Sequence, residues 1–218
     1  MGSIAEKAGR RAARFALLVV CMSVLGAPTQ AQTAGTLDGL FRRMAGIEAL
    51  ECHFHEEKRI ELLFAPIVTE GSIHYVRPGR MARRATSPST QVLLIDGSSL
   101  RMWDGSREET LDLASQPVVR SFVDSILSLL AGDRAALERN YTLALTPSPE
   151  GLVLTLTPRS HPLDQFLRSI RFTMTTGYDL LRMEMLEVSG DSTITTFSAV
   201  NDHRRYTPAE LTRFFSLR

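Results

Sequence analysis

The chain has 218 residues, with 25 Lys or Arg and 24 Asp or Glu, which gives a formal net charge of +1. This length predicts one domain with enough chain to bury a hydrophobic core. The balanced charge leaves no basic footprint for nucleic acid, so we exclude the nucleic-acid-binding classes.

Residues 1–31 are predicted to be a secretory signal peptide. Four basic residues against one acidic residue precede an uncharged apolar run over 15–25. That run is too short to span a bilayer comfortably, and small residues follow it, so we predict cleavage after Ala31. An uncleaved anchor is the alternative, and the pair Arg10-Arg11 leaves the twin-arginine route open beside the general secretory route.

Cleavage there would have two consequences for the mature chain, 32–218. Four positive charges and one negative charge are removed, which leaves 21 basic and 23 acidic residues and a net charge of −2. Cys21 lies in the leader, so Cys52 is the single cysteine of the mature chain, and an intramolecular disulfide is excluded.

The mature chain begins with a predicted amphipathic helix that Thr36 caps. Its apolar residues recur at steps of three or four, as Leu37, Leu40, Phe41, Met44 and Ile47. A strand over 50–63 follows, with Cys52 and Phe54 on its apolar face. Further strands are predicted over 68–77, 80–86, 90–95, 99–103 and 108–113, because Gly, Pro and Asp turn signals separate them.

Two helices then interrupt the strands. Pro117 opens the first helix, which has a broad apolar stripe and ends at Gly132. Asp133 caps the second helix, which runs to Tyr141. Strands resume over 142–146, 152–157, 170–176, 180–188 and 193–200. The capping-box spacing of Thr207-Pro208-Ala209-Glu210 predicts a short closing helix over 211–215. The pattern as a whole predicts a mainly β fold with helices, of the α+β class.

The segment 64–88 contains an unusual pattern. Ile73, Tyr75 and Arg77 lie two residues apart, so they share one strand face. A guanidinium cannot lose its proton and is rarely buried without acceptors, so Arg77 needs carboxylate or carbonyl partners near the apolar surface. Pro78 and Gly79 then turn the chain back.

Enzyme chemistry finds little support in the sequence. The chain has no Gly-x-Ser-x-Gly elbow and no Gly-rich phosphate loop, and Cys52 is expected to be buried and inert. His53, His55 and Glu57 share a strand face and could begin a metal site, but no further ligand is evident, so we favour a solvated polar face. We therefore predict no catalytic residues, no metal and no cofactor.

What remains is a sheet with one strongly apolar face, and helices broad enough to cover it. Six methionines of the mature chain add soft surface, suited either to a flexible apolar guest or to filling a core. They are Met44, Met81, Met102, Met174, Met183 and Met185.

Several of these residues together resemble a known family. The family is the bacterial periplasmic outer-membrane lipoprotein carrier, LolA, and the similar residues are Pro66-x4-Gly71-x-Ile73-x-Tyr75-x-Arg77-Pro78, Pro88, Val92-Leu93-Leu94-Ile95-Asp96-Gly97 and Leu100. Phe54-x-Glu56 fits as well, where that family usually shows Phe-x-Gln. The resemblance covers nearly all of the mature chain.

The resemblance implies a fold and a role. The fold is an incomplete antiparallel β-barrel, a cup whose apolar face is covered by a helical lid, and we expect a periplasmic monomer. Its cargo would be lipoprotein acyl chains or other lipids, received from an inner-membrane exporter and passed to an outer-membrane acceptor. Arg77 matches the family arginine that latches the lid. The residues expected to line the cup and lid are Phe54, Ile73, Tyr75, Met81, Leu93, Ile95, Val119, Phe122, Val123, Ile126, Leu130, Leu154, Phe172, Met174 and Met183.

The chain departs from the family pattern at Arg83, where a tryptophan is common, with Arg80 and Arg84 nearby. These arginines could contact anionic head groups or an acidic transporter surface, or they are solvated strand charges. The chain resembles a divergent branch that accompanies lipid exporters, so the cargo stays open between a lipoprotein, a glycolipid and an aryl-polyene lipid. Two other functions stay open: a lipid-sensing or regulatory interaction module of the same fold, and an enzyme acting on lipid intermediates.

Overall fold

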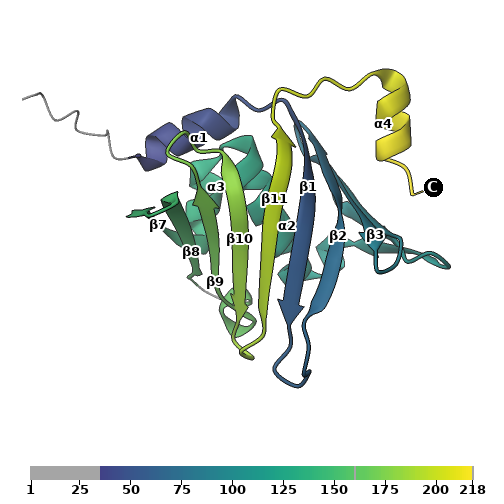
Figure 1. The fold of residues 1–218 in the computed structure, drawn as a ribbon, viewed down its shortest axis with the longest axis horizontal. Helices are drawn as coiled ribbons and strands as arrows, with labels where there is room; N and C mark the ends of the chain where they lie inside the picture. The colour runs from purple at the N-terminus through teal and green to yellow at the C-terminus, as the bar shows by residue number, and fades with distance from the viewer. Residues whose placement is uncertain (1–34, 160, 218) are drawn as a thin grey trace, which may run out of the picture. The chain divides into compact units, whose positions relative to one another are not determined.

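The computed structural model describes residues 35–159 and 161–217, so the predicted signal peptide, 1–31, lies outside the described residues. Within these ranges, eleven strands form one antiparallel sheet in the order β6-β5-β4-β3-β2-β1-β11-β10-β9-β8-β7 (Figure 1). The first half contains β1 (Ala49–Arg59), β2 (Ile67–Val76), β3 (Arg80–Ser87), β4 (Gln91–Asp96), β5 (Ser99–Trp103) and β6 (Glu108–Asp112). The second half contains β7 (Tyr141–Ser148), β8 (Gly151–Pro158), β9 (Leu167–Met174), β10 (Leu180–Glu187) and β11 (Ser192–Asn201).

The strands β1 and β11 lie at the centre of the sheet and join its two halves. Phe54 of β1 is opposite Gly71 of β2 on one side and Phe197 of β11 on the other. Among the described strands, β6 and β7 form the two edges and do not pair with each other, so the sheet is open. The predicted incomplete antiparallel barrel of the α+β class is thereby confirmed.

The first two helices begin and end where the sequence predicts. Thr36 caps α1 (Leu37–Ala45), because its side-chain oxygen accepts a hydrogen bond from the Gly39 N–H at 3.0 Å. The helix α2 (Pro117–Ala131) has proline at its first position and ends at Gly132, which has a φ of 71°.

The later helices also carry the predicted caps. Asp133 caps α3 (Arg134–Asn140), and Thr207 and Glu210 form the capping box of α4 (Pro208–Phe214). Two short 3-10 helices were not predicted, namely η1 (Leu113–Ser115) and η2 (Leu163–Gln165). None of the helices in the described ranges is long and apolar enough to cross a membrane.

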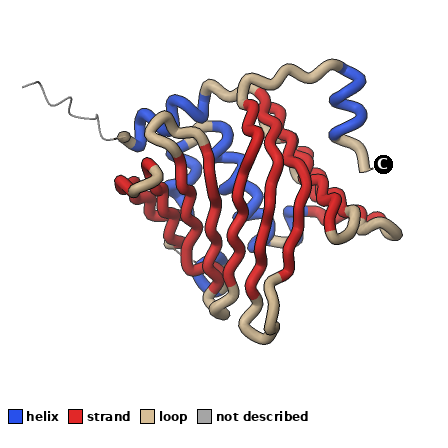
Figure 2. Tube along the Cα trace, viewed as in Figure 1, coloured by secondary structure: helices blue, strands red, loops and turns tan. Residues whose placement is uncertain are grey.

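The two faces of the sheet have different covers. The helices α1, α2 and α3 lie on one face, which we call the inner face, and they are seen behind the strands in Figures 1 and 2. The helix α4 lies against the opposite, outer face. Alternation along β4 distinguishes the faces, because Leu93 and Ile95 pack with residues of α2, whereas Val92 and Leu94 pack with Leu217, just after α4.

Some strand boundaries differ from the prediction. The predicted strand over 50–63 is wrong beyond Arg59, because residues 60–66 form the β1–β2 turn, in which the Leu63 N–H donates to the Ile60 carbonyl at 2.9 Å. Leu113 belongs to η1 rather than to the preceding strand. Arg77 lies just after β2, in the turn to β3, so its side chain leaves the sheet at the end where α1 and α2 terminate.

Candidate functional site

Arg77 lies where the ends of two covering helices meet. Its Nη2 donates to the carbonyl oxygens of Met44 and Ala45, at the end of α1, at 3.3 and 2.9 Å. Its Nη1 donates to the carbonyl of Ala131, the last residue of α2, at 3.3 Å. Nε and Nη2 donate to the carbonyl of Ile47 at 3.2 and 3.0 Å. Helix ends leave carbonyls without partners and carry a partial negative charge, so one guanidinium neutralises both ends.

Gly132 brings the two helix ends together. Its positive φ is one that other residues adopt only with strain. A Cβ at this position would lie 2.5 Å from the Ala45 nitrogen and from the Phe41 carbonyl oxygen, both in the backbone of α1. Real Cβ atoms do not approach backbone so closely, so α2 packs on α1 here only with glycine. The two helices thus form one cover, which we call the inner cover, with Arg77 at their junction.

The residues predicted to line the cup gather beneath this cover. Nine of the fifteen lie in one apolar cluster, namely Ile73, Tyr75, Phe122, Ile126, Leu130, Leu154, Phe172, Met174 and Met183. Five lie in a second cluster, namely Met81, Leu93, Ile95, Val119 and Val123. Leu127 of α2 packs against both clusters, so the apolar stripe of α2 joins the two halves of the inner face. Phe54 lies in neither cluster, although it is buried.

Protein side chains fill the inner face. Tyr75 and Leu154, near its centre, are both 0% exposed. Phe122 and Ile126 of α2 pack against the same cluster. Protein interiors are close-packed, so no acyl-sized space remains between this helix and the strands. A long apolar ligand could reach the inner face only by displacing the inner cover.

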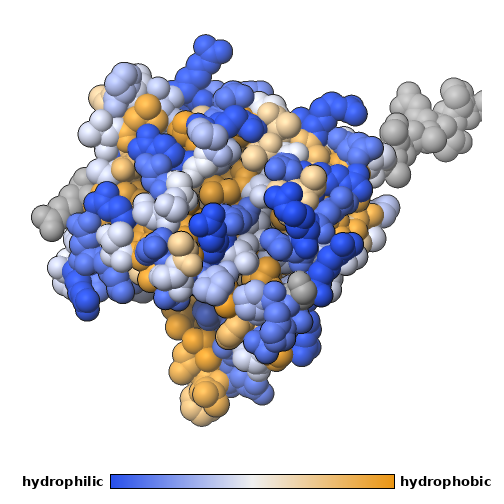
Figure 3. Space-filling model, turned by 180° about the vertical axis from the view of Figure 1, so that it is seen from behind, coloured by the Kyte–Doolittle hydropathy of each residue, from blue (hydrophilic) through white to orange (hydrophobic). Residues whose placement is uncertain are grey.

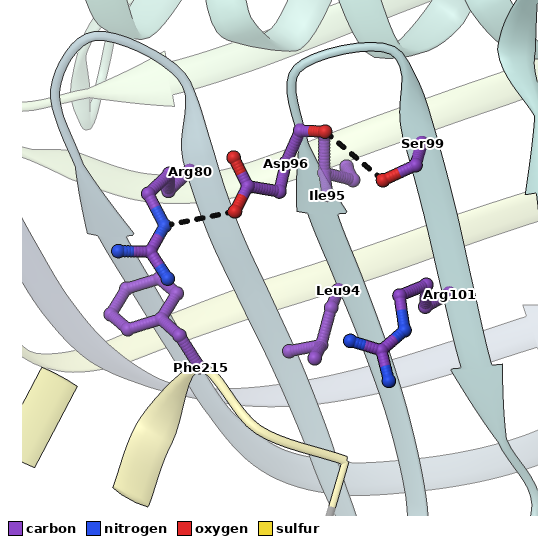
Figure 4. Close-up of a pocket in the computed structure, with 7 residues that line it drawn as sticks. All are labelled: Arg80, Leu94, Ile95, Asp96, Ser99, Arg101 and Phe215. Atoms are coloured by element: carbon purple, nitrogen blue, oxygen red, sulfur yellow. Dashed lines mark hydrogen bonds and ion pairs between the residues drawn. The ribbon is translucent and has the colours of Figure 1, made fainter. Parts of the chain in front are cut away.

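Two hollows lie outside these clusters. One of about 30 Å³ lies on the outer face, between Arg80, Leu94 and Phe215 (Figure 4), and has room for one or two water molecules. The other, of about 380 Å³, runs along α2 and α3 and has Asp124 and Arg139 in its lining. Its charged lining differs from the mostly apolar lining of sites that enclose apolar ligands.

A polar cluster on the inner face was missed by the sequence analysis. Arg83 is opposite Ile73 on one side and Leu93 on the other, which places it on the inner face. Its guanidinium lies 4.3 Å from the centroid of the Phe54 ring, and its Nη2 lies 2.9 Å from Glu56 Oε1. This explains why Phe54 lies outside both apolar clusters. Strict alternation along the strand would have been enough to find Arg83 there.

The neighbouring arginines face the other way. Arg84 Nη1 donates to the carbonyls of Phe214 and Ser216, at 3.2 and 2.7 Å, and its burial lowers its pKa. The guanidinium of Arg80 lies 5.0 Å from the centroid of the Phe215 ring. The two arginines therefore bind the segment at the end of α4 to the outer face, and they are engaged within the protein.

The residues considered for chemistry have structural surroundings. Cys52 is 2% exposed, and burial raises the pKa of its thiol to about 12, so it stays protonated and unreactive. His55 Nδ1 lies 2.8 Å from Glu70 Oε1, and this hydrogen bond raises the pKa of His55. Within the described ranges, no group of three or more His, Cys, Asp or Glu side chains could hold a metal ion.

Comparison with protein families gives one match over most of the chain. The model of the family described as outer membrane lipoprotein carrier protein LolA matches residues 48–212. This range contains Arg77 and every residue predicted to line the cup. Among curated proteins, an outer-membrane lipoprotein carrier protein of Cupriavidus pinatubonensis is 28% identical over 198 residues, which cover 88% of this chain and 89% of that protein. Another, of Chromohalobacter salexigens, is 24% identical and covers 88% and 87%.

Solved structures give distant similarities. A LolA superfamily protein of Nitrosomonas europaea is 12% identical, covers 80% of this chain and 94% of its own, and has a TM-score of 0.43. A chain of the Pseudomonas aeruginosa MucA/MucB complex is 16% identical, covers 80% of this chain and 60% of its own, and has a TM-score of 0.49.

Proposed function

Because the chain belongs to the LolA family of outer membrane lipoprotein carrier proteins, we propose that it carries the acyl chains of lipoproteins or related lipids. The acyl chains would bind on the inner face of the sheet and be shuttled toward the outer membrane. One observation carries the proposal: a single arginine, Arg77, binds the ends of both helices that cover this apolar face.

The inner face offers an exchange of one apolar cover for another. When α2 moves away, the apolar side chains of the strands lose its stripe, and an acyl chain supplies apolar contact in its place. Each methylene moved out of water is worth about 0.8 kcal/mol, so a long chain provides several kcal/mol even after the cost of ordering it. Since apolar contacts are lost and regained, a polar interaction can decide which state is populated.

Arg77 is the group suited to that decision. Its five hydrogen bonds to helix-end carbonyls break when the ends of α1 and α2 part. A hydrogen bond to a charged group contributes roughly 1.5–3 kcal/mol when it is shielded from water, and less at a partly exposed side chain such as this one. Arg77 would thus act as a latch that favours the closed state until cargo enters and restores it when cargo leaves.

The proposal includes a location and partners. A chain exported by the predicted signal peptide, 1–31, would act in the periplasm as a monomer. An inner-membrane exporter would donate the lipid and an outer-membrane acceptor would receive it. We expect no catalytic step and no cofactor, because transfer needs only the exchange of noncovalent contacts.

Native mass spectrometry of the mature protein from its bacterial periplasm, followed by lipid extraction, tests the proposal. A stoichiometric acyl or aryl-lipid adduct would support it and identify the cargo. A protein that is empty and also ignores added lipids would contradict it, and would favour the lipid-sensing or regulatory interaction module.

A cross-link tests whether the cover must move. A Cβ at Gly79 would lie 3.7 Å from Leu127 Cδ1 of α2, so a Gly79→Cys/Leu127→Cys variant brings two thiols close enough for a short bifunctional thiol reagent. The cross-linked protein should fail to take up lipid, while the same variant without the reagent takes it up. Cys52 is buried and should not compete for the reagent. Uptake by the cross-linked protein would argue against a displaced cover.

A further inference from the structure

One end of the sheet carries an exposed apolar surface. Of the eight large apolar side chains that are exposed in the described ranges, seven lie at the end formed by the β1–β2 and β10–β11 turns, namely Leu62, Leu63, Phe64, Ile67, Val68, Phe166 and Val188. The eighth, Val200, lies at the other end of β11. Figure 3 shows the projection as an orange tip at the lower end of the molecule. We call residues 62–68 the apolar tip.

The apolar tip is fixed in place but does not pack. The Leu63 N–H donates to the Ile60 carbonyl, and the Glu61 N–H donates to Asp191 Oδ1 of the β10–β11 turn at 3.0 Å. The side chains of Leu62 and Phe64 are nevertheless 90% and 111% exposed. Exposed apolar surface adds nothing to folding stability, and a contiguous patch of it marks an interaction site.

The chemistry of the tip favours a lipid surface over a protein. Residues 62–68 are Leu-Leu-Phe-Ala-Pro-Ile-Val, so their side chains offer no hydrogen-bond donor or acceptor. Protein interfaces combine an apolar centre with about one hydrogen bond per 100–200 Å². A projecting, wholly apolar tip instead fits a medium that needs no directional partner. The acyl region of a bilayer is such a medium.

The charges behind the tip are balanced. Lys58 and Arg59 are positive, and Glu57 and Glu61 are negative, so the segment that enters the tip carries no net charge. The β10–β11 turn adds the negative Asp191. Attraction to anionic lipid therefore contributes little, and zwitterionic head groups are sufficient.

We propose that the apolar tip inserts into the surface of a phospholipid bilayer and docks the protein there. The side chains would reach the boundary between head groups and acyl chains, about 5–10 Å deep. Deeper entry is opposed because turn backbone groups need water or head groups as partners. This docking is independent of what the inner face binds.

Vesicle sedimentation tests the docking. The mature protein should sediment with sucrose-loaded phosphatidylcholine vesicles, and raising the ionic strength should leave binding unchanged. A Leu62→Ser/Phe64→Ser variant should bind on the order of tenfold more weakly, because it removes the two most exposed apolar side chains. Val200→Ser is the matched control, since it removes an exposed apolar side chain at the opposite end.

A fluorescent probe gives the depth. Trp103 is the single tryptophan of the chain, so Phe64→Trp in a Trp103→Phe background places the only indole in the tip. Its emission should shift to the blue with phosphatidylcholine vesicles and be quenched by lipids brominated near the head group, whereas Val200→Trp in the same background should not respond.

Three outcomes would overturn the docking: no vesicle binding by the unmodified protein, equal binding by the Leu62→Ser/Phe64→Ser variant, or binding that requires an added membrane protein. The last would identify a protein partner. Lipid carriage is tested separately, because a tip variant that loses vesicle binding should keep its lipid adduct. Vesicle binding without any adduct would overturn carriage and leave the docking standing.

Discussion

Both faces of the sheet are covered by helices, and on each face an arginine of the β2–β3 hairpin binds the carbonyls at a helix end. Arg77 binds the ends of α1 and α2 on the inner face, and Arg84 binds the end of α4 on the outer face. The covers differ in what they rest on. The inner cover packs on two large apolar clusters, whereas the outer cover packs on a small cluster and on a buried imidazole, His74.

This difference shows which cover a lipid could replace. Contacts between α2 and the inner face are apolar and without direction, so an acyl chain can substitute for them. Contacts of the outer cover are directional, because they include a ring stacked on His74 and hydrogen bonds from Arg84 to two carbonyls. An acyl chain cannot supply these. We therefore interpret the same arginine device as a latch on one face and as a fixed clamp on the other.

Gly132→Ala should have the largest effect, because it attacks the junction of the inner cover. The new Cβ meets α1 backbone at 2.5 Å and the residue keeps an unfavourable φ. We expect the free energy of unfolding to fall by roughly 3 kcal/mol, from strain and from separation of the helices. Urea denaturation measures this loss.

Gly97→Ala separates the two causes in that experiment. Gly97 also has a positive φ, of 60°, but a Cβ there would have nothing within 4 Å. Its variant should lose only about 1 kcal/mol, from backbone strain. If both alanine variants lose the same free energy, the close approach of α2 to α1 is not what holds the inner cover together.

Arg77→Leu tests the latch directly. We expect cargo binding to be retained and transfer to an acceptor to slow in a reconstituted assay, because the closed state loses its polar interaction. Stability should fall by roughly 2 kcal/mol, since helix-end carbonyls lose their donor. Arg101→Leu on β5 removes an exposed ion pair with Glu108 and should change neither quantity. Transfer at the unmodified rate would contradict the latch.

Arg84→Leu should act on the outer cover alone. We expect a loss of about 1–2 kcal/mol in unfolding free energy, because the Phe214 and Ser216 carbonyls lose a charged donor. Amide hydrogen exchange should accelerate over residues 204–217 and not in α1 or α2. The lipid adduct should persist at its normal level. An altered adduct would mean that the two covers are coupled, and the comparison between them would fail.

Local signals in the sequence were sufficient for the elements. The caps at Thr36 and Asp133 and the end of α2 at Gly132 were predicted correctly, because such signals act within about four residues. The sequence analysis did not place the covers, because contacts between distant segments decide which face a helix covers. Arg83 and Arg84 show this, since adjacent residues serve opposite faces.

The sequence also concealed the apolar tip. Leu62 and Leu63 were assigned to a continuing strand, because an apolar pattern does not distinguish a buried residue from one that projects into solvent. The need of Arg77 for carbonyl or carboxylate acceptors followed from its chemistry, but the helices that supply them required the family resemblance and then the structure. The ligand contacts of the inner-face residues stay a prediction.

The outer cover also contains a titratable group at its centre. His74 is 1% exposed and stacks on Phe214 with ring centroids 4.1 Å apart. Tyr206 donates its hydroxyl proton to the Leu50 carbonyl at 3.0 Å, so it accepts from His74 Nδ1–H at 3.1 Å, and the imidazole is neutral. Burial is the main cause that lowers the pKa of His74. The surrounding charges are Arg84, Arg204 and His53, which lower this pKa further, and Glu51, which raises it.

The lowered pKa gives the smallest predicted effect and a defined direction. The unfolded chain binds a proton near pH 6.5, whereas folded His74 binds it only at lower pH. The stability from neutral His74 is therefore fully present above pH 6.5 and is lost as the pH falls through the folded pKa. His74→Gln should flatten this decline in unfolding free energy, while His203→Gln, at a side chain that is 89% exposed, should not. If both variants decline as the unmodified protein does, His74 is not the acid-sensitive group, and the outer cover is a fixed clamp at every pH tested.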